Sequence, residues 1–253
     1  MRRLRFGEWG VEVESELLVL ASERCSLAPF LDPGVSPRLA LRYGAIPASE
    51  GRPLNPRRPE GARLHLQGGA LHVGPPEDAL DAELALRAAL HLATLEQGGL
   101  LFHASGIAFG GKALVAVGRS GAGKSTFARL ARQAGGELLS DEVLALFPDG
   151  RVLGTPFRSD PDMEGTAREA TLGGLFSLVH ASEESLAPLA PAAMAPLLLA
   201  QVFRAPGDGL SRAGLLQWVS GLASRFPAYR FFFRNHAEAG GYLRRWWESH
   251  AAG

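Results

Sequence analysis

The chain has 253 residues, enough for one large domain or two modest ones. Its 26 basic and 26 acidic side chains balance to a formal net charge of zero, and 46% of its residues are hydrophobic. These values are ordinary for a globular protein and argue against nucleic-acid and membrane partners. The sequence has no signal-peptide core and no apolar run of membrane-spanning length, and its single cysteine, Cys25, cannot form an internal disulfide. We therefore expect a cytoplasmic protein.

Residues 1–76 differ in composition from the rest of the chain. Residues 4–13 alternate between apolar and polar, and residues 63–73 are typical of a hairpin that turns at a Gly-Gly pair. Stretches rich in proline and glycine lie between these two segments. We expect a small β-rich N-terminal module here and assign residues 77–253 to a second, larger domain.

The clearest predicted helix covers residues 78–97, which have acids in the first turn, leucines at helical spacing and two glycines after the end. Residues 100–109 follow as a predicted strand, which turns back through two glycines into the apolar segment 113–117. This hairpin places His103, in its first strand, beside the second strand.

Residues 118–125, GRSGAGKS, match the pattern G-x-x-x-x-G-K-[ST] of the phosphate-binding P-loop. The loop lies between a buried strand and a helical segment, where the N–H groups of a helix N-terminus can hold a phosphate. Lys124 would reach the β- and γ-phosphates, and Ser125 would coordinate Mg²⁺. The only other lysine is Lys112, so the composition alone gives no reason to expect a lysine at position 124. We assign nucleotide binding to Gly118, Arg119, Ser120, Gly121, Ala122, Gly123, Lys124, Ser125 and Thr126.

Residues 137–146, ELLSDEVLAL, place two acids, Asp141 and Glu142, inside an apolar segment. Buried charges need a partner, and a Mg²⁺ ion on nucleotide phosphates would be one. Adjacent side chains on a strand point to opposite faces, so we expect the two acids at a strand end. The alternative is an exposed turn.

Residues 154–160, GTPFRSD, form a predicted loop with two hydroxyl groups and a guanidinium. We predict that Thr155 and Arg158 contact the substrate or the transferring phosphate, with Ser159 as the second hydroxyl nearby. The Gly-Thr-Pro sequence is also ordinary for a turn.

The C-terminal third is predicted to alternate between helices and one strand. Residues 161–185 are compatible with a helix around an apolar centre, residues 172–179. Further elements are expected as helices at 194–203 and 210–224, a strand at 229–233, and a final helix. That helix carries Trp246 and Trp247, which we interpret as an exposed pair and a candidate interface.

In their order and close spacing, the segments HASGIAF, GRSGAGKST, LLSDE and GTPF resemble the catalytic domain of HPr kinase/phosphorylase and its smaller relatives. Some of these relatives phosphorylate lasso-peptide precursors. The resemblance covers about residues 98–240 and implies an α/β fold of the HPr kinase and PEP carboxykinase type, a mixed sheet flanked by helices. It implies ATP and Mg²⁺ as cofactors and, because the large relatives are oligomeric, a homo-oligomer. The Gly- and Asn-rich signature of the large enzymes is not found, so neither phosphorylase activity nor HPr as partner is implied.

Position by position, the resemblance implies that Asp141 is the general base toward the acceptor hydroxyl and that His103 orients it or tunes its pKa. Lys124 would neutralise the transferring phosphate. Glu142 stands where the family usually has a second Asp and would hold Mg²⁺ with Ser125. The implied function is transfer of the ATP γ-phosphate to a hydroxyl, preferably of serine, in a peptide or protein such as a natural-product precursor.

Other functions stay open at this point. The chain could be a P-loop ATPase or regulatory nucleotide-binding module, in which water is the acceptor, although it lacks the ABC signature and the guanine-reading N-K-x-D sequence. A small-molecule kinase or a PEP-carboxykinase-like activity is compatible with the same motifs. A non-catalytic scaffold is less consistent with the intact Lys124, Ser125 and Asp141.

Overall fold

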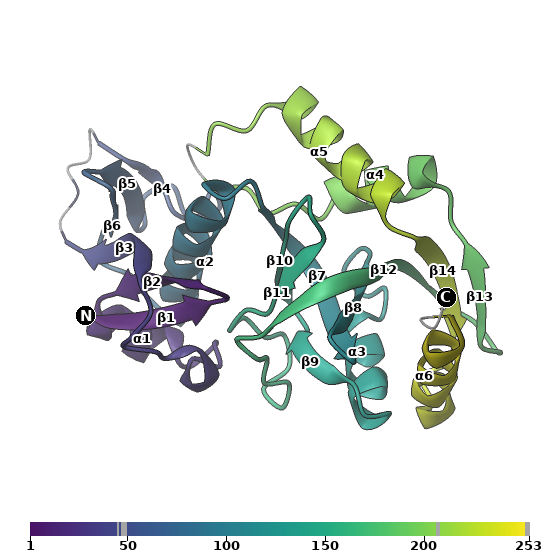
Figure 1. The fold of residues 1–253 in the computed structure, drawn as a ribbon. Helices are drawn as coiled ribbons and strands as arrows, with labels where there is room; N and C mark the ends of the chain where they lie inside the picture. The colour runs from purple at the N-terminus through teal and green to yellow at the C-terminus, as the bar shows by residue number, and fades with distance from the viewer. Residues whose placement is uncertain (45, 47–49, 206–207, 251–253) are drawn as a thin grey trace. The chain divides into compact units, whose positions relative to one another are not determined.

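The computed structural model has a mixed α/β architecture, with six α-helices among the described residues, and confirms the predicted α/β class (Figure 1). The described parts of the chain are residues 1–44, 46, 50–205 and 208–250. Helices in these parts are all too short or too polar to span a membrane. The chain forms two compact units, which consist of residues 1–99 with 203–209 and of residues 100–202 with 210–253.

The first unit contains a six-stranded sheet in the order β1-β2-β3-β6-β5-β4. Its elements are β1 (Arg2–Phe6), β2 (Trp9–Val13), α1 (Ser15–Ala21), a 3₁₀ turn (Ala28–Phe30), β3 (Pro37–Tyr43), β4 (Arg52–Pro53), β5 (Arg63–Gln67), β6 (Ala70–Val73) and α2 (Ala79–Leu95). The predicted hairpin at 63–73 is confirmed, because β5 and β6 pair antiparallel. Its two turn glycines, Gly68 and Gly69, have φ angles of +58° and +75°, which residues with a Cβ rarely adopt.

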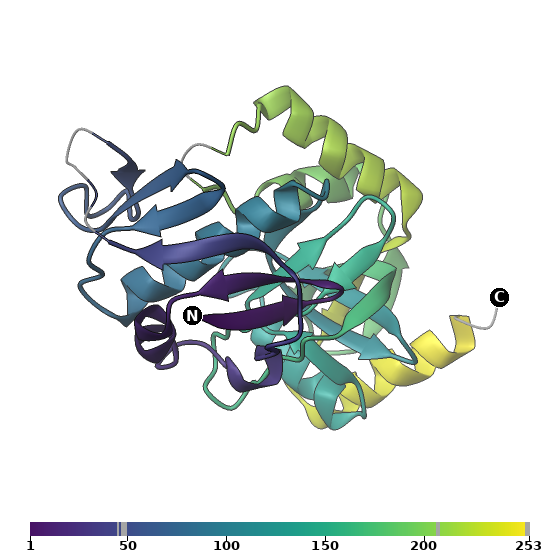
Figure 2. The same cartoon turned by 60° about the vertical axis from the view of Figure 1, so that its left-hand side comes forward.

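Helix α2 confirms the helix predicted at 78–97, and it packs across the sheet of the first unit (Figure 2). The Asp78 carboxylate caps its N-terminus by accepting the Asp81 N–H at 3.0 Å. The helix buries alanines and leucines against β2, β3 and α1. The predicted division at residues 76 and 77 would therefore separate α2 from its packing partners, whereas the compact unit continues to Gly99.

The second unit contains a mixed sheet in the order β11-β10-β7-β8-β12-β14-β13, with β9 paired on β7. Its strands are β7 (Leu100–Phe109), β8 (Lys112–Val117), β9 (Glu137–Ser140), β10 (Val143–Leu146), β11 (Arg151–Leu153), β12 (Glu169–His180), β13 (Ser185–Pro188) and β14 (Ala228–Phe233). Its helices are α3 (Lys124–Gln133), α4 (Pro191–Leu199), α5 (Arg212–Arg225) and α6 (Ala237–His250). Strand β8 pairs antiparallel with β7 and parallel with β12, so the sheet predicted to be mixed is mixed.

Helices cover both faces of this sheet. Helices α3 and α6 lie together on one face, and α4 and α5 lie together on the other (Figures 1 and 2). Alternate residues of the central strands, such as Leu114 and Phe176, form one buried cluster with Phe127 of α3 and Leu243 of α6. A central strand covered on both faces has apolar side chains in both directions, which explains the continuous apolar run of β8.

The helix-compatible interpretation of residues 161–185 is wrong, because β12 occupies Glu169–His180. This strand pairs parallel with both β8 and β14 in the middle of the sheet. A short apolar run cannot be assigned to a strand or a buried helix by periodicity alone, and here the pairing with distant strands selects the strand. The strands and helices predicted around 194–233 are confirmed as α4, α5 and β14, with α4 shifted toward its N-terminal proline.

The interpretation of Trp246 and Trp247 as an exposed pair is also wrong. Both are half-buried, and the Trp246 ring lies 4.7 Å from the Tyr229 ring and 6.0 Å from the Phe176 ring, centroid to centroid. The Trp247 ring covers Gly173, where a Cβ would lie 2.5 Å from it. The pair therefore fixes α6 to the sheet, and the homo-oligomer remains a prediction without this support.

Helix α6 approaches α3 through Gly240, where a Cβ would lie 2.1 Å from the Leu130 carbonyl oxygen. We expect Gly240→Ala to lower the free energy of unfolding by about 1–3 kcal/mol, the usual cost of overpacking. The control is Gly241→Ala, whose Cβ would meet only the flexible end of Arg245, 3.3 Å away. This neighbour should be neutral or stabilising by up to about 1 kcal/mol, because alanine is the better helix former. Urea unfolding of both variants measures the difference, and equal effects would contradict the packing argument.

Candidate functional site

The P-loop of the second unit connects the buried strand β8 to helix α3, as predicted. Gly121 and Gly123 have φ angles of +80° and +96°, which only glycine adopts readily. A Cβ on Gly123 would lie 3.1 Å from the Phe233 ring and 3.3 Å from His180. The first N–H groups of a helix have no partner inside the helix, so this end of α3 presents donors to an anion.

Lys124 is the first residue of α3 and is 7% exposed. Its ammonium group donates to the carbonyl oxygens of Gly118, at 3.0 Å, and of Arg119, at 3.3 Å. The hydroxyl of the buried Ser105 on β7 donates to the Lys124 carbonyl, which ties the start of α3 to the sheet. Burial lowers the pKa of Lys124, so an anion beside it would stabilise its charged form.

A cavity of about 320 Å³ opens over the P-loop. Its lining comes from β7, the P-loop and α3, the β9–β10 turn, the loop after β11, and the end of β12. The lining residues are His103, Ser120, Gly121, Gly123, Lys124, Ser125, Thr126, Glu142, Ser159 and His180. Most of the predicted site residues therefore meet in one pocket of one compact unit.

The two acids lie at a strand end, as predicted, between β9 and β10. Ser140 shapes the turn, since its hydroxyl oxygen accepts the N–H groups of Glu142 and Val143, each at 3.2 Å, and donates to the Phe157 carbonyl at 2.9 Å. The turn gives the adjacent acids different surroundings. Asp141 is buried, whereas Glu142 lines the cavity.

Asp141 is 1% exposed and accepts three hydrogen bonds from the loop after β11. The N–H groups of Ser159 and Asp160 each donate to it at 3.2 Å, and the Ser159 hydroxyl donates as well. Burial raises the pKa of Asp141, and these donors oppose the shift. A carboxylate with a raised pKa that holds a hydroxyl group is the arrangement that a general base requires.

His103 lies on β7 directly opposite Val143 of β10. Its Nδ1 lies 3.4 Å from the Glu142 carboxylate. The family resemblance implied that His103 orients Asp141 or tunes its pKa, but the register of the two strands sets it against the neighbouring acid, Glu142. His103 therefore contacts Glu142, one of the two predicted Mg²⁺ ligands.

Ser125 lines the same cavity, and its hydroxyl oxygen is 2.8 Å from that of Ser159. Mg²⁺ bound to a nucleotide takes most of its ligands from phosphates and water and few from protein. Among the described residues, no three His, Cys, Asp or Glu side chains gather as a metal cluster. The hydroxyl of Ser125 and the carboxylate of Glu142, both on the cavity, fit an ion that arrives with the phosphates.

The two predicted substrate residues are placed differently from what we expected. Thr155 is fully buried, and its hydroxyl donates to the Val143 carbonyl at 2.6 Å, so it holds the loop to β10. Arg158 donates to the Pro161 carbonyl at 2.9 Å within its own loop. The side chain of this loop that reaches the cavity is Ser159.

His180 is a site residue that the sequence analysis missed. It ends β12, lines the cavity and packs against the Phe233 ring, with 5.6 Å between ring centroids. A strand assignment for residues 172–179 would have revealed it, because parallel neighbours such as β8 and β12 end at the same edge of a sheet.

Comparison with protein-family models and with curated protein sequences gives no match. Among solved structures, the chain is similar to the HPr(Ser) kinase/phosphatase from Coxiella burnetii, with 13% sequence identity and a TM-score of 0.30. The alignment covers 57% of this chain and 94% of that chain. A similarity of this size does not establish a shared family or activity, so a function must be inferred from the residues of the pocket.

Proposed function

We propose that the chain is an ATP-dependent kinase that transfers the γ-phosphate to a hydroxyl group, preferably of serine, in a peptide or protein. One observation carries this proposal. The hydroxyl of Ser159 donates a hydrogen bond to the buried Asp141, and Ser159 lines the same cavity as the P-loop lysine. A phosphate-binding loop alone would fit any nucleotide-binding protein. A carboxylate that already holds a hydroxyl beside that loop favours a hydroxyl acceptor over water.

The residues divide the chemistry between them. The N–H groups at the start of α3 and the Lys124 ammonium would hold the phosphates and neutralise their charge. Phosphoryl transfer depends more on such positioning and charge neutralisation than on covalent catalysis. Ser125 and Glu142 would hold a Mg²⁺ ion, which would supply further charge neutralisation at the phosphates. Asp141 would accept the proton of the acceptor hydroxyl, and the His103–Glu142 pair would keep the second acid turned toward the cavity.

Nucleotide binding is the first test. Thermal unfolding of the full chain should shift upward with Mg²⁺·ATP, since binding to the native state alone stabilises it by about 2.7 kcal/mol at a hundredfold excess over Kd. Omission of Mg²⁺ should reduce the shift. A chain that shows no shift at any nucleotide concentration would contradict the proposal.

Transfer is the second test, with γ-labelled ATP and a panel of serine- and threonine-containing peptides. We expect label in peptides and ADP formation that depends on the added acceptor. Continuous ADP formation over many turnovers without any acceptor would instead identify an ATPase. Label in a small-molecule alcohol but in none of the peptides would assign the acceptor to another class.

A further inference from the structure

The hydroxyl of Ser159 lies beside both the proposed base and the P-loop. It donates to Asp141, the proposed base, and its oxygen lies 2.8 Å from the P-loop hydroxyl of Ser125. Ser159 is exposed and lines the same cavity as Lys124. The other hydroxyl-bearing residues of that lining, Ser120, Ser125 and Thr126, belong to the P-loop and the start of α3.

The loop that carries Ser159 is held in place at several points. The preceding Phe157 is buried, and its carbonyl accepts from Ser140 at 2.9 Å. The Ser159 and Asp160 N–H groups both donate to Asp141, and the Asp160 carboxylate accepts the Asp162 N–H at 3.0 Å. A hydroxyl fixed on a base beside a phosphate-binding loop has the high effective concentration of an intramolecular reactant.

We propose that Ser159 is a phosphoacceptor of the chain's own active site, an inference that rests on the proposed kinase function. In this step the Ser159 oxygen forms a bond to the γ-phosphorus of ATP, and the bond between that phosphorus and the β-γ bridging oxygen breaks. The Asp141 carboxylate takes the hydroxyl proton, and ADP leaves with the bridging oxygen. The products are one phosphoserine and one ADP per chain.

The product changes the charge of the site. A phosphoserine carries a charge of about −1.5 to −2 at neutral pH. It would arise on the hydroxyl that donates to Asp141, in the cavity that Glu142 also lines. Repulsion should therefore drive the modified side chain away from Asp141, and the reaction should stop at one phosphate per chain.

The experiment is incubation of the full chain with Mg²⁺ and γ-labelled ATP over a range of protein concentrations, followed by intact-mass measurement and peptide mapping. We expect one phosphate per chain, located on Ser159, at a fractional rate independent of protein concentration. Ser159→Ala should reduce labelling to the level of Lys124→Ala. The matched control is Ser185→Ala, an exposed serine on β13, which should label like the wild type.

A second variant distinguishes loss of the acceptor hydroxyl from loss of labelling through misfolding. Ser159→Thr keeps a hydroxyl at the same position and should acquire phosphothreonine there. A chain that binds Mg²⁺·ATP and phosphorylates peptides but carries no phosphate on residue 159 would overturn this inference and leave the kinase function standing. A fractional labelling rate, that is, a rate per chain, that rises in proportion to protein concentration would overturn the intramolecular step. A chain that neither binds Mg²⁺·ATP nor transfers phosphate would overturn both proposals.

Discussion

Replacement of Lys124 by alanine should abolish the stabilisation by Mg²⁺·ATP and lower phosphoryl transfer by about 10²-fold or more. Lys124 is 7% exposed, and two carbonyl oxygens hold its ammonium group within the P-loop, so the charge is preorganised for a phosphate at the start of α3. Preorganised charge needs no rearrangement when the transition state forms, and for this reason its loss is costly. Thermal unfolding with and without Mg²⁺·ATP, together with label transfer, measures both effects.

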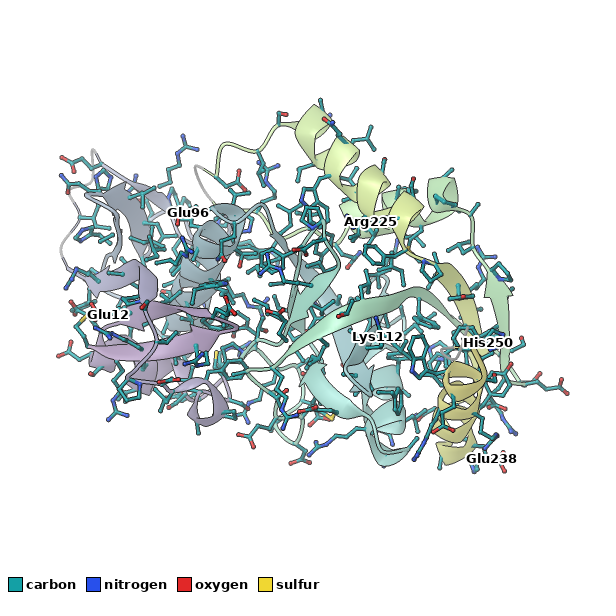
Figure 3. All side chains as sticks on the ribbon, in the orientation of Figure 1. Glu12, Glu96, Lys112, Arg225, Glu238 and His250 are labelled. Atoms are coloured by element: carbon teal, nitrogen blue, oxygen red, sulfur yellow. The ribbon has the colours of Figure 1, made fainter. Side chains whose placement is uncertain are left out.

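The chain offers a matched control, because its only other lysine is Lys112. That residue is exposed at the first position of β8 and is labelled in Figure 3. Lys112→Ala removes the same charge from the same molecule and should leave the nucleotide-dependent shift unchanged. An equal loss in both variants would mean that net charge, rather than the P-loop position, governs binding.

Asp141→Asn should abolish transfer and leave Mg²⁺·ATP binding intact. Loss of a general base typically costs 10²–10⁴-fold in rate. Asparagine keeps the size of the side chain and an oxygen to accept from Ser159, but it cannot take a proton. The exposed Asp162, in the loop that carries Ser159, provides the control, and Asp162→Asn should retain activity. Normal turnover of peptide by Asp141→Asn would show that the base is another group.

The raised pKa of Asp141 also predicts how activity depends on pH. As the proposed base, Asp141 would act in its ionised form, and burial raises its pKa above the ordinary value of 3.8. Transfer by the wild type should therefore fall as the pH drops through that raised pKa, at a higher pH than an ordinary carboxyl group would require. A profile whose acid limb lies at or below the ordinary value would contradict the assignment.

The same shift has a consequence for stability. A carboxyl group whose pKa is raised in the folded state binds its proton more tightly there than in the unfolded chain, so stability falls as the pH rises between the two values. Asp141→Asn removes this cost. The free energy of unfolding of the variant minus that of the wild type should therefore be larger at neutral pH than at acid pH. Urea unfolding at both pH values measures this difference. If the difference in free energy of unfolding between the variant and the wild type is the same at both pH values, burial does not control the pKa of Asp141.

The P-loop and its flanking elements could be predicted because they are local. A strand, a glycine-rich turn and a helix N-terminus follow one another within residues 113–133, and the phosphate contacts that they offer need no distant partner. The break at Asp141 and Glu142 was predictable for a similar reason, since two adjacent acids cannot continue a buried strand at low cost.

Everything that depends on pairing between distant segments required the tertiary structure. Residues 172–179 form a strand because β8 and β14 pair on both sides, and only this pairing brings His180 to the cavity. The register of β7 against β10 sets His103 against Glu142 rather than Asp141.

The loop after β11 shows the same limit at the level of single side chains. The sequence indicated a loop with two hydroxyls and a guanidinium, but composition does not reveal which of them is buried. In the folded protein the Thr155 hydroxyl is used by the β10 backbone, whereas Ser159 reaches Asp141 and the cavity. The P-loop motif is thus encoded in a contiguous segment, while the hydroxyl that meets the proposed base, Asp141, is selected by contacts between segments far apart in the chain.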